Sequence, residues 1–453
     1  MKRVYLDWGV VSSLKKPEFF DVKEFLLTRK KDLFFVYSSA HFQDAMRSKD
    51  NARLTQDVEM LEDLVDDHFL AYNSKMVRPY LVTPTVYYRE NKGRELDTIP
   101  DICKAIYPLG DDMPVIGGIV KLMTEWPFSI PEVVRQDKMF QIAFPELPAS
   151  PSLMDVIQSC ITFINKLQRN RNYYKKYRSE LQSSGFKVDS NSGNWSSDEV
   201  IPNISEFLKS LGIDKTFKEL VLTGFENEEK VDNFRFFISA YSLLDLIGYK
   251  SDKLSKATSA MNSVTTDAQH AYYAAFCDYL ITLDTRLASK AQALYRELGV
   301  STKIISPAIV FNELKEDKKE AISLFLKEQL REEHIESQYD RAVVYKFDHR
   351  FLGIFSHCIV YEQDDGALIE FKLAFDNYSR FIFYGEAGVM VDTVSEYLGL
   401  PLNCNYERVR ESIVSGDTSA SINWPGDGIH LMLRADSERH RPELLISIQT
   451  DKN

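Results

Sequence analysis

Four aspartates stand where a folded chain could bring their carboxylates together. Asp7 ends the apolar run VYL, and Asp284 ends the mostly apolar run YLITL. Asp44 follows a second apolar run, LFFVY, and Asp267 precedes the YLIT segment. Clustered carboxylates raise each other's pKa unless cations neutralise them, and oxygen ligands select hard cations such as Mg²⁺ or Mn²⁺. Two such ions about 4 Å apart can activate a water and stabilise a leaving oxygen, which is the chemistry of phosphodiester hydrolysis.

Two histidines accompany these acids. His41 lies three residues before Asp44, and His270 lies three residues after Asp267. Each pair would share one face of a helix. The histidines could therefore orient carboxylates or contact a substrate phosphate, although a buried structural histidine is an equally good interpretation.

Each aspartate also has a structural interpretation. Asp7 and Asp284 could cap the helices that follow them. Asp267 could be a first-turn residue favoured by the helix dipole, and Asp44 is one of many acids in this part of the chain. Convergence of the four is what would distinguish a metal site from separate caps.

The elements that would position these residues alternate between strands and helices. Strands are expected over residues 3–7, residues 32–37, DYLITLD and STKIIS. Helices are expected over FFDVKEFLLTRK, SSAHFQDAMRS, LTQDVEMLEDLVDDHFL, TTDAQHAYYAAFC with Thr265 or Thr266 as its cap, and TRLASKAQALYRELG, which Gly299 ends. This alternation predicts a parallel sheet, whose ligands bind beyond the carboxyl ends of the strands. All four aspartates are therefore expected at one edge.

The chain here resembles the PIN-domain ribonucleases. The resemblance rests on VYLD, YSSAHFQD and DAQHAYYAAFCDYLITLDTRL, and it covers roughly residues 1–72 and 236–306. It implies a PIN-like α/β sheet flanked by helices. It also implies a metal-dependent endoribonuclease that leaves 5′-phosphate and 3′-hydroxyl products.

The resemblance assigns roles residue by residue. Asp7, Asp44, Asp267 and Asp284 match the metal-binding, catalytic acids of the family, which hold Mg²⁺ or Mn²⁺. Thr282 matches the hydroxyl residue beside the last acid. Asp278 begins the YLIT strand, farther from its carboxyl end, and is expected to support the site indirectly or to be structural.

The remaining chain surrounds and follows this sheet. Residues 73–235 are expected to form a mostly helical insertion, residues 307–340 a connecting helix, and residues 341–453 an α+β domain with mostly antiparallel strands. Its expected strands are AVVYKF, HCIVYE, ALIEFKLAF, RFIFYGE, IHLMLRA and ELLISIQT, with a helix in GVMVDTVSEYLGL. No catalytic motif is evident there.

A basic stretch in the insertion, KLQRNRNYYKKYR, could contact RNA. Its cations are Lys166, Arg169, Arg171, Lys175, Lys176 and Arg178, and three tyrosines alternate with them. Cations for phosphates and rings for base stacking suit single-stranded RNA. A charged helix end is the commoner explanation of such a run.

Composition and charge exclude several kinds of protein. The 453 residues carry a formal net charge of −12, which argues against nonspecific wrapping of nucleic acid by the whole surface. The sequence shows no membrane-spanning run and no signal peptide, so a cytoplasmic protein is expected. Five scattered cysteines without a CxxC pair suggest reduced thiols.

Of two other functions that the sequence brings into question, one remains open and one is discounted. A catalytically degenerate PIN-like module could bind RNA or a protein partner, and Gly9 favours it because the family often has Asn or Ser at that position. A haloacid dehalogenase-type phosphatase also begins with a strand-end Asp, but DWGVV lacks the second acid of DxDxT. A protein partner or a homo-oligomer is compatible with either main function.

Overall fold

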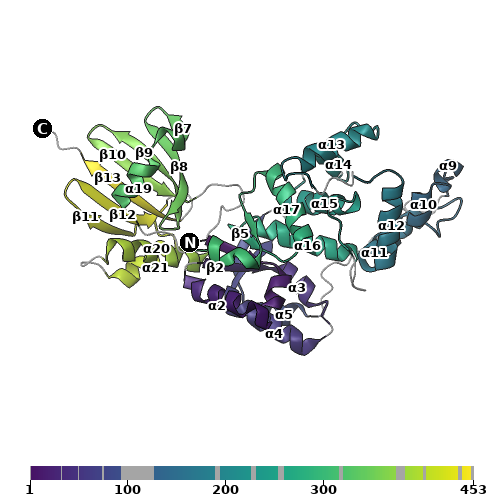
Figure 1. Ribbon diagram of the computed structural model, residues 1–453, viewed down its shortest axis with the longest axis horizontal. Helices are drawn as coiled ribbons and strands as arrows, with labels where there is room; N and C mark the ends of the chain where they lie inside the picture. Colours follow the sequence, from purple (N-terminus) through teal and green to yellow (C-terminus); the bar gives the residue numbers. More distant parts are fainter. Residues whose placement is uncertain are drawn as a thin grey trace, which may run out of the picture.

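The computed structural model has three parts along its long axis. A C-terminal antiparallel sheet lies at one end, a mostly parallel sheet lies in the middle, and the helices of the insertion extend to the other end (Figure 1). The structure describes residues 2–31, 33–48, 50–73, 76–92, 127–188, 194–225, 231–253, 260–315, 320–373, 383–400, 405–436 and 441–449. None of the described helices is long and apolar enough to cross a membrane.

The middle sheet has six strands in the order β4-β3-β2-β1-β5-β6. The strands are β1 (Lys2–Leu6), β2 (Leu33–Ser38), β3 (His68–Tyr72), β4 (Val77–Leu81), β5 (Tyr279–Ile281) and β6 (Lys303–Ile305). β4 is antiparallel to β3, and all other neighbours are parallel. The predicted parallel sheet is therefore present, and β1 lies at its centre.

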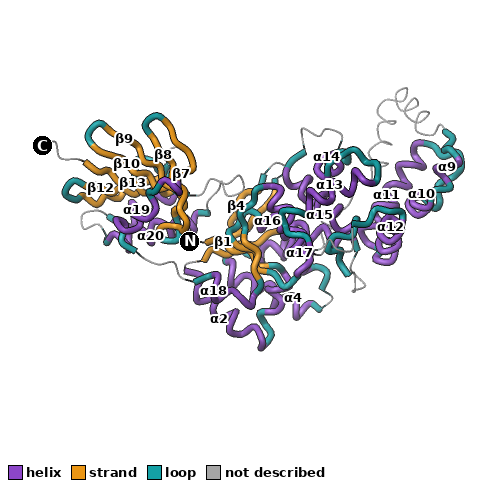
Figure 2. Tube along the Cα trace, turned by 45° about the horizontal axis from the view of Figure 1, so that its top comes forward, coloured by secondary structure: helices purple, strands orange, loops and turns teal. Residues whose placement is uncertain are grey.

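Both faces of this sheet are covered by helices, which explains the continuous apolar runs of its strands. Side chains alternate between the two faces. Val4 and Leu6 belong to one core, and Tyr5 belongs to the other. The first face packs against α1 (Trp8–Ser13), α2 (Phe20–Thr28) and α4 (Asn51–Val65), and the second against α15 (Asn233–Leu246), α16 (Met261–Ala274) and α17 (Thr285–Leu298). Figure 2 shows the strands between these helices.

Two local predictions in this part were wrong. The helix over LTQDVEMLEDLVDDHFL ends at Val65, because Asp66 turns the chain at a positive φ of 52° and residues 68–72 form β3. Thr265 and Thr266 do not cap α16, since this helix already begins at Met261 after Ala260. The prediction that Gly299 ends α17 is confirmed by its left-handed φ of 66°.

The described part of the insertion is mostly helical. It contains α5 (Pro84–Asn91), α9 (Glu132–Arg135), α10 (Lys138–Ala143), α11 (Leu153–Arg169), α12 (Arg171–Ser183), α13 (Val200–Ser210) and α14 (Phe217–Leu222). α11 contacts α16, and α12 contacts α15. The insertion therefore packs directly on the helices that cover one face of the middle sheet.

The C-terminal sheet has seven antiparallel strands in the order β11-β12-β13-β10-β9-β8-β7. They are β7 (Ile335–Tyr339), β8 (Ala342–Phe351), β9 (Phe355–Gln363), β10 (Gly366–Lys372), β11 (Ser421–Pro425), β12 (Ile429–Ala435) and β13 (Pro442–Gln449). The helices α19 (Ile322–Gln329), α20 (Tyr384–Leu398) and α21 (Tyr406–Val414) accompany them. The predicted antiparallel α+β character is confirmed.

Two predictions here were also wrong. Residues 307–340 do not form one helix: α18 (Val310–Glu313) ends where the carbonyl of Leu314 accepts a hydrogen bond from Arg29, and β7 pairs with β8. RFIFYGE is not a strand throughout, because α20 begins at Tyr384, while residues 380–382 lie outside the described part of the chain.

A buried ion-pair network joins the C-terminal part to the amino ends of β1 and β5. Arg3 pairs with Glu386 on α20 at 2.8 Å, and their side chains are only 8% and 9% exposed. Asp278, immediately before β5, pairs with Arg350 on β8 and accepts a hydrogen bond from the backbone N–H of Arg3 at 2.7 Å. This end of the sheet is therefore used for internal contacts.

Replacing Glu386 with Ala should destabilise this junction. The guanidinium of Arg3 would remain buried without its main carboxylate, and breaking such a pair costs about 3 to 5 kcal/mol. Urea unfolding followed by tryptophan fluorescence would measure the loss. The exposed Glu396 on the same helix supplies the matched control, Glu396→Ala. Equal stability of the two variants would contradict a stabilising role for the Arg3 pair.

Candidate metal centre

Asp7, Asp44 and His270 converge at the carboxyl end of β1. One ligand atom from each side chain lies within 4.8 Å of the others. The residues come from three elements: the turn after β1, the last turn of α3 (Ser39–Ala45), and α16. The predicted convergence of Asp7 and Asp44 is therefore seen, and His270 is the third member of the group.

The carboxylate of Asp7 is not engaged as a helix cap. Asp7 occupies the N-cap position of α1, yet its side chain makes no capping hydrogen bond. Instead Thr282 Oγ1 donates to Asp7 Oδ2 at 2.9 Å, and the backbone N–H of Asp7 donates to Ile281 O at 3.0 Å. Thr282 thus orients the carboxylate of Asp7.

Each carboxylate oxygen of Asp44 has one side-chain partner. Its Oδ2 lies 3.1 Å from His270 Nε2, and its Oδ1 accepts a hydrogen bond from Arg47 at 2.7 Å. Burial opposes its ionisation, but the hydrogen bond to His270 and the charges of His270 and Arg47 together lower the pKa of Asp44. Asp44 is therefore an ionised ligand candidate.

The buried hydroxyl of Tyr5, on β1, forms a hydrogen bond with Nδ1 of the His270 ring. Tyr5 Oη lies 2.9 Å from His270 Nδ1 and 2.7 Å from Ser38 Oγ. A histidine that ligates a metal through one nitrogen usually makes a hydrogen bond through the other. Tyr5 leaves Nε2 of His270 facing the carboxylates.

His41 has a structural role beside this group. Its Nδ1 accepts a hydrogen bond from the backbone N–H of Ser38 at 3.1 Å, and its Nε2 donates to Leu6 O at 2.8 Å. Burial, with a further contribution from His270, lowers the pKa of His41 to about 3. His41 is thus a neutral ring that fixes the end of β1 next to Asp7.

Asp267 and Asp284 lie outside the group of three. Asp267 is partly buried, and among the described residues its carboxylate has no hydrogen-bond or ion-pair partner. Asp284 is exposed and caps α17, accepting hydrogen bonds from the N–H groups of Arg286 and Leu287. Its own N–H donates to Thr282 Oγ1 at 3.0 Å, so Thr282 links Asp284 to Asp7.

The site carries more negative charge than it neutralises. Burial raises the pKa of Asp7, and the carboxylates of Asp44 and Asp284 raise it further, while His270 and Thr282 act in the opposite direction. Burial and the carboxylates of Asp252, Asp44 and Asp7 raise the pKa of Asp267 well above its usual value. A cation bound here would lower the pKa of both Asp7 and Asp267.

Sequence reasoning missed a buried lysine on α17. Lys290 on α17 is fully buried, and its ammonium lies 3.2 Å from Asp245 Oδ1 and 3.0 Å from Asp252 Oδ1. It also lies 4.4 Å from the centre of the Tyr241 ring. The signal was available: Lys290 falls at helical spacing among apolar positions 287, 291 and 294, on the face that becomes buried.

Asp278 and Gly9 are also placed by the structure. Asp278 lies at the amino end of β5 in the ion-pair network with Arg350, so it supports the domain junction and not the group of three. A Cβ atom at Gly9 would lie 3.3 Å from Asp7 Oδ2. Glycine therefore leaves open space beside this carboxylate.

The basic stretch of the insertion is only partly available for RNA. Arg178 is bound internally, donating to Asp245 Oδ2 at 2.7 Å. Tyr174 is fully buried, and Tyr173 donates its hydroxyl hydrogen to Ile142 O at 2.5 Å. The remaining cations, of which Arg169 and Lys176 are exposed, are Lys166, Arg169, Arg171, Lys175 and Lys176. The tyrosine rings pack in the fold, so the predicted stacking role for them finds no support.

The donor set fits a divalent ion. Two carboxylates and one imidazole nitrogen converge here. The carboxylate of Asp7 makes no capping hydrogen bond to α1, and the ion pairs of the described residues do not fully neutralise it. Oxygen ligands with one imidazole suit Mn²⁺ and related first-row ions better than Mg²⁺, which prefers oxygen alone. No protein-family model, curated protein or solved structure matches this chain.

Replacing Asp267 with Asn should stabilise the metal-free protein. Because the folded chain raises the pKa of Asp267 above its unfolded value, ionisation costs stability at pH 7, and this cost disappears as the pH falls below about 4. The gain should be larger at pH 7 than at pH 5, measured by urea unfolding with EDTA. Asp63→Asn, at an exposed position of α4, is the control. A less stable Asp267→Asn protein at pH 7 would contradict the charge imbalance.

Proposed function

We propose that this protein is a divalent-metal-dependent endoribonuclease, with Mn²⁺ or Mg²⁺ held by Asp7, Asp44 and His270. The observation that carries the proposal is the convergence of these three ligand atoms within 4.8 Å at the carboxyl end of β1. The resemblance of residues 1–72 and 236–306 to PIN-domain ribonucleases supports the choice of RNA as the substrate.

The chain's own residues would organise the reaction. Thr282 holds the Asp7 carboxylate, Arg47 holds one oxygen of Asp44, and Tyr5 fixes the ring of His270. A bound divalent ion would lower the pKa of a coordinated water and offset charge on the attacked phosphate. In-line attack by water would break the bond to the 3′ oxygen and leave a 5′-phosphate and a 3′-hydroxyl.

Asp267 and Asp284 would have a supporting part in this function. Asp267 lies on α16, about one turn before His270, and would add a carboxylate near the ion without belonging to the group of three. Asp284 lies at the exposed rim and is coupled to Asp7 through Thr282. The exposed cations Arg169 and Lys176 are the best candidates for contacts with single-stranded RNA outside the centre.

Removing one ligand should abolish cleavage. Asp7→Asn and Asp44→Asn should each lower Mn²⁺-dependent cleavage of a labelled single-stranded RNA by more than about 100-fold, since even outer-shell changes cost about 10- to 100-fold. Asp63→Asn should leave the rate unchanged. Product ends would be identified by their susceptibility to a 5′-phosphate-dependent exonuclease.

Two outcomes would contradict the nuclease proposal. Full activity in both ligand variants would place the chemistry elsewhere. RNA binding by the wild-type chain without Mn²⁺-dependent cleavage would support the alternative function, a PIN-like module that binds RNA or a protein partner.

His270 should set the preference between metals. An imidazole nitrogen strengthens binding of Mn²⁺ relative to Mg²⁺, so calorimetry should show Mn²⁺ bound at least about tenfold more tightly than Mg²⁺. His270→Asn should reduce that ratio toward one while the far-ultraviolet circular dichroism stays unchanged. An unchanged ratio in the folded variant would show that His270 is not a ligand.

A further inference from the structure

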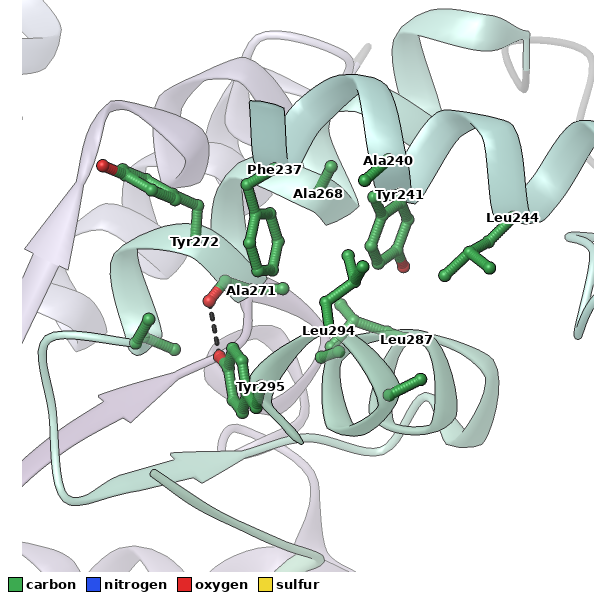
Figure 3. Close-up of a cluster of buried hydrophobic side chains, with 14 of the residues drawn as sticks. Phe237, Ala240, Tyr241, Leu244, Ala268, Ala271, Tyr272, Leu287, Leu294 and Tyr295 are labelled. Carbon is green, nitrogen blue, oxygen red and sulfur yellow. Dashed lines mark hydrogen bonds between the residues drawn. The ribbon is translucent and has the colours of Figure 1, made fainter. Parts of the chain in front are cut away.

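Helix α16 of the proposed metal centre is held in place by the helices on both sides of it. Ala268 and Ala271 of α16 lie in one buried layer with Phe237 of α15 and Leu294 of α17 (Figure 3). The hydroxyl of Tyr295 on α17 donates a hydrogen bond to the carbonyl of Ala271. Helix α16 is therefore a fixed element against which other parts of the site can be positioned.

One arginine joins α3 to this fixed helix. Arg47 follows the last turn of α3, and its Nη2 donates to Asn262 O at 2.7 Å and to Thr266 Oγ1 at 2.6 Å, both on α16. Its Nη1 donates to Asp44 Oδ1 at 2.7 Å. The other oxygen of Asp44 lies 3.1 Å from His270 Nε2, one turn farther along α16. Three hydrogen bonds thus hold the guanidinium directly beside two of the three proposed ligands.

The guanidinium is fixed but not enclosed. An arginine has five N–H groups, and the three hydrogen bonds leave at least Nε–H and one Nη1–H without a partner in the described part of the chain. The side chain of Arg47 is 27% exposed, whereas that of His270 is fully buried. Arg47 is therefore a preorganised cation at the edge of the group of three, with part of its donor set open to solvent.

Charge and donor chemistry at this place suit an anion. The carboxylates of Asp7 and Asp44 balance the charge of one divalent ion, so the charge of Arg47 is left over when the ion is bound. Arg47 uses Oδ1 of Asp44, and Oδ2 of the same carboxylate faces His270. Guanidinium groups bind phosphate oxygens through strong, charged hydrogen bonds. The open donors of Arg47 therefore fit a phosphodiester.

We propose that Arg47 binds the phosphate of the substrate at this site. Its open N–H groups would donate to a nonbridging oxygen of the attacked phosphodiester and would stabilise the negative charge that develops there. This inference rests on the proposed function and adds the residue that recognises the phosphate. A residue that only positions Asp44 would act on metal binding instead, so the two roles give different kinetics.

The variant Arg47→Met removes the charge and keeps much of the side-chain length. At saturating Mn²⁺, its kcat/KM for a labelled single-stranded RNA should be at least about tenfold lower than that of the wild type, as expected for the loss of a charged hydrogen bond. Calorimetry should show that Mn²⁺ binds no more weakly than to the wild type, because a competing cation has been removed. Arg53→Met, at an exposed position of α4, is the control and should match the wild type in both measurements.

Two results would overturn the role of Arg47 and leave the nuclease proposal intact. One is wild-type kcat/KM in folded Arg47→Met. The other is weaker Mn²⁺ binding with cleavage that saturating Mn²⁺ restores, since Arg47 would then act only through Asp44. If Arg47→Met does not fold, Arg47→Lys decides: one ammonium cannot bind Asp44, α16 and a phosphate together, so wild-type kcat/KM in this variant would also overturn the proposal. A wild-type chain without Mn²⁺-dependent cleavage would overturn both proposals.

Discussion

Repulsion among carboxylates at the carboxyl end of β1 is the constraint on which this structure depends. Asp7, Asp44 and Asp267 lie close enough to raise or oppose one another's ionisation. The fold partly neutralises this charge, since Arg47 pairs with one oxygen of Asp44 at 2.7 Å. Among the described residues, the side chain of Asp7 accepts one hydrogen bond, from the hydroxyl of Thr282. The uncompensated part of this charge is the physical basis of the proposed metal site.

Charged side chains are paired differently at the two ends of the parallel strands. At the amino ends, Arg3 and Arg350 neutralise Glu386 and Asp278 in a closed network that joins the C-terminal part. At the carboxyl ends, the cations are fewer than the acids and one carboxylate has no partner among the described residues. The amino end therefore has the properties of a structural junction, and the carboxyl end those of a binding site.

The sequence predicted the parts of the site that depend on local pattern. The apolar run ending at Asp7, and the helix with Asp44 that follows the second apolar run, placed these two residues at one edge of a parallel sheet, because strand direction follows from the alternation of strands and helices. It could not predict that His270, and not Asp267, completes the group, since both lie on α16 and its rotation is set by packing against α3 and α15. The strand at residues 68–72, where the sequence predicted the end of a helix, shows the same limit: a short apolar run after a helix fits either structure.

The partners of Lys290 could not be predicted from the sequence. Its position among apolar residues of α17 marked it as buried, but its partners Asp245 and Asp252 lie at least 38 residues away in the sequence and are brought to it by the packing of α15. Such long-range pairs follow from the assembled core. They are visible only once α15, α16 and α17 have been placed together.

A crystal of the full chain soaked in Mn²⁺ tests the central claim most directly, because anomalous scattering locates the ion. The account predicts an anomalous peak within coordination distance of Asp7, Asp44 and His270, with the bond from His270 Nε2 to Asp44 replaced by a bond to the ion. Absence of a peak there at a Mn²⁺ concentration that labels other sites, with the His270 to Asp44 hydrogen bond intact, would contradict it.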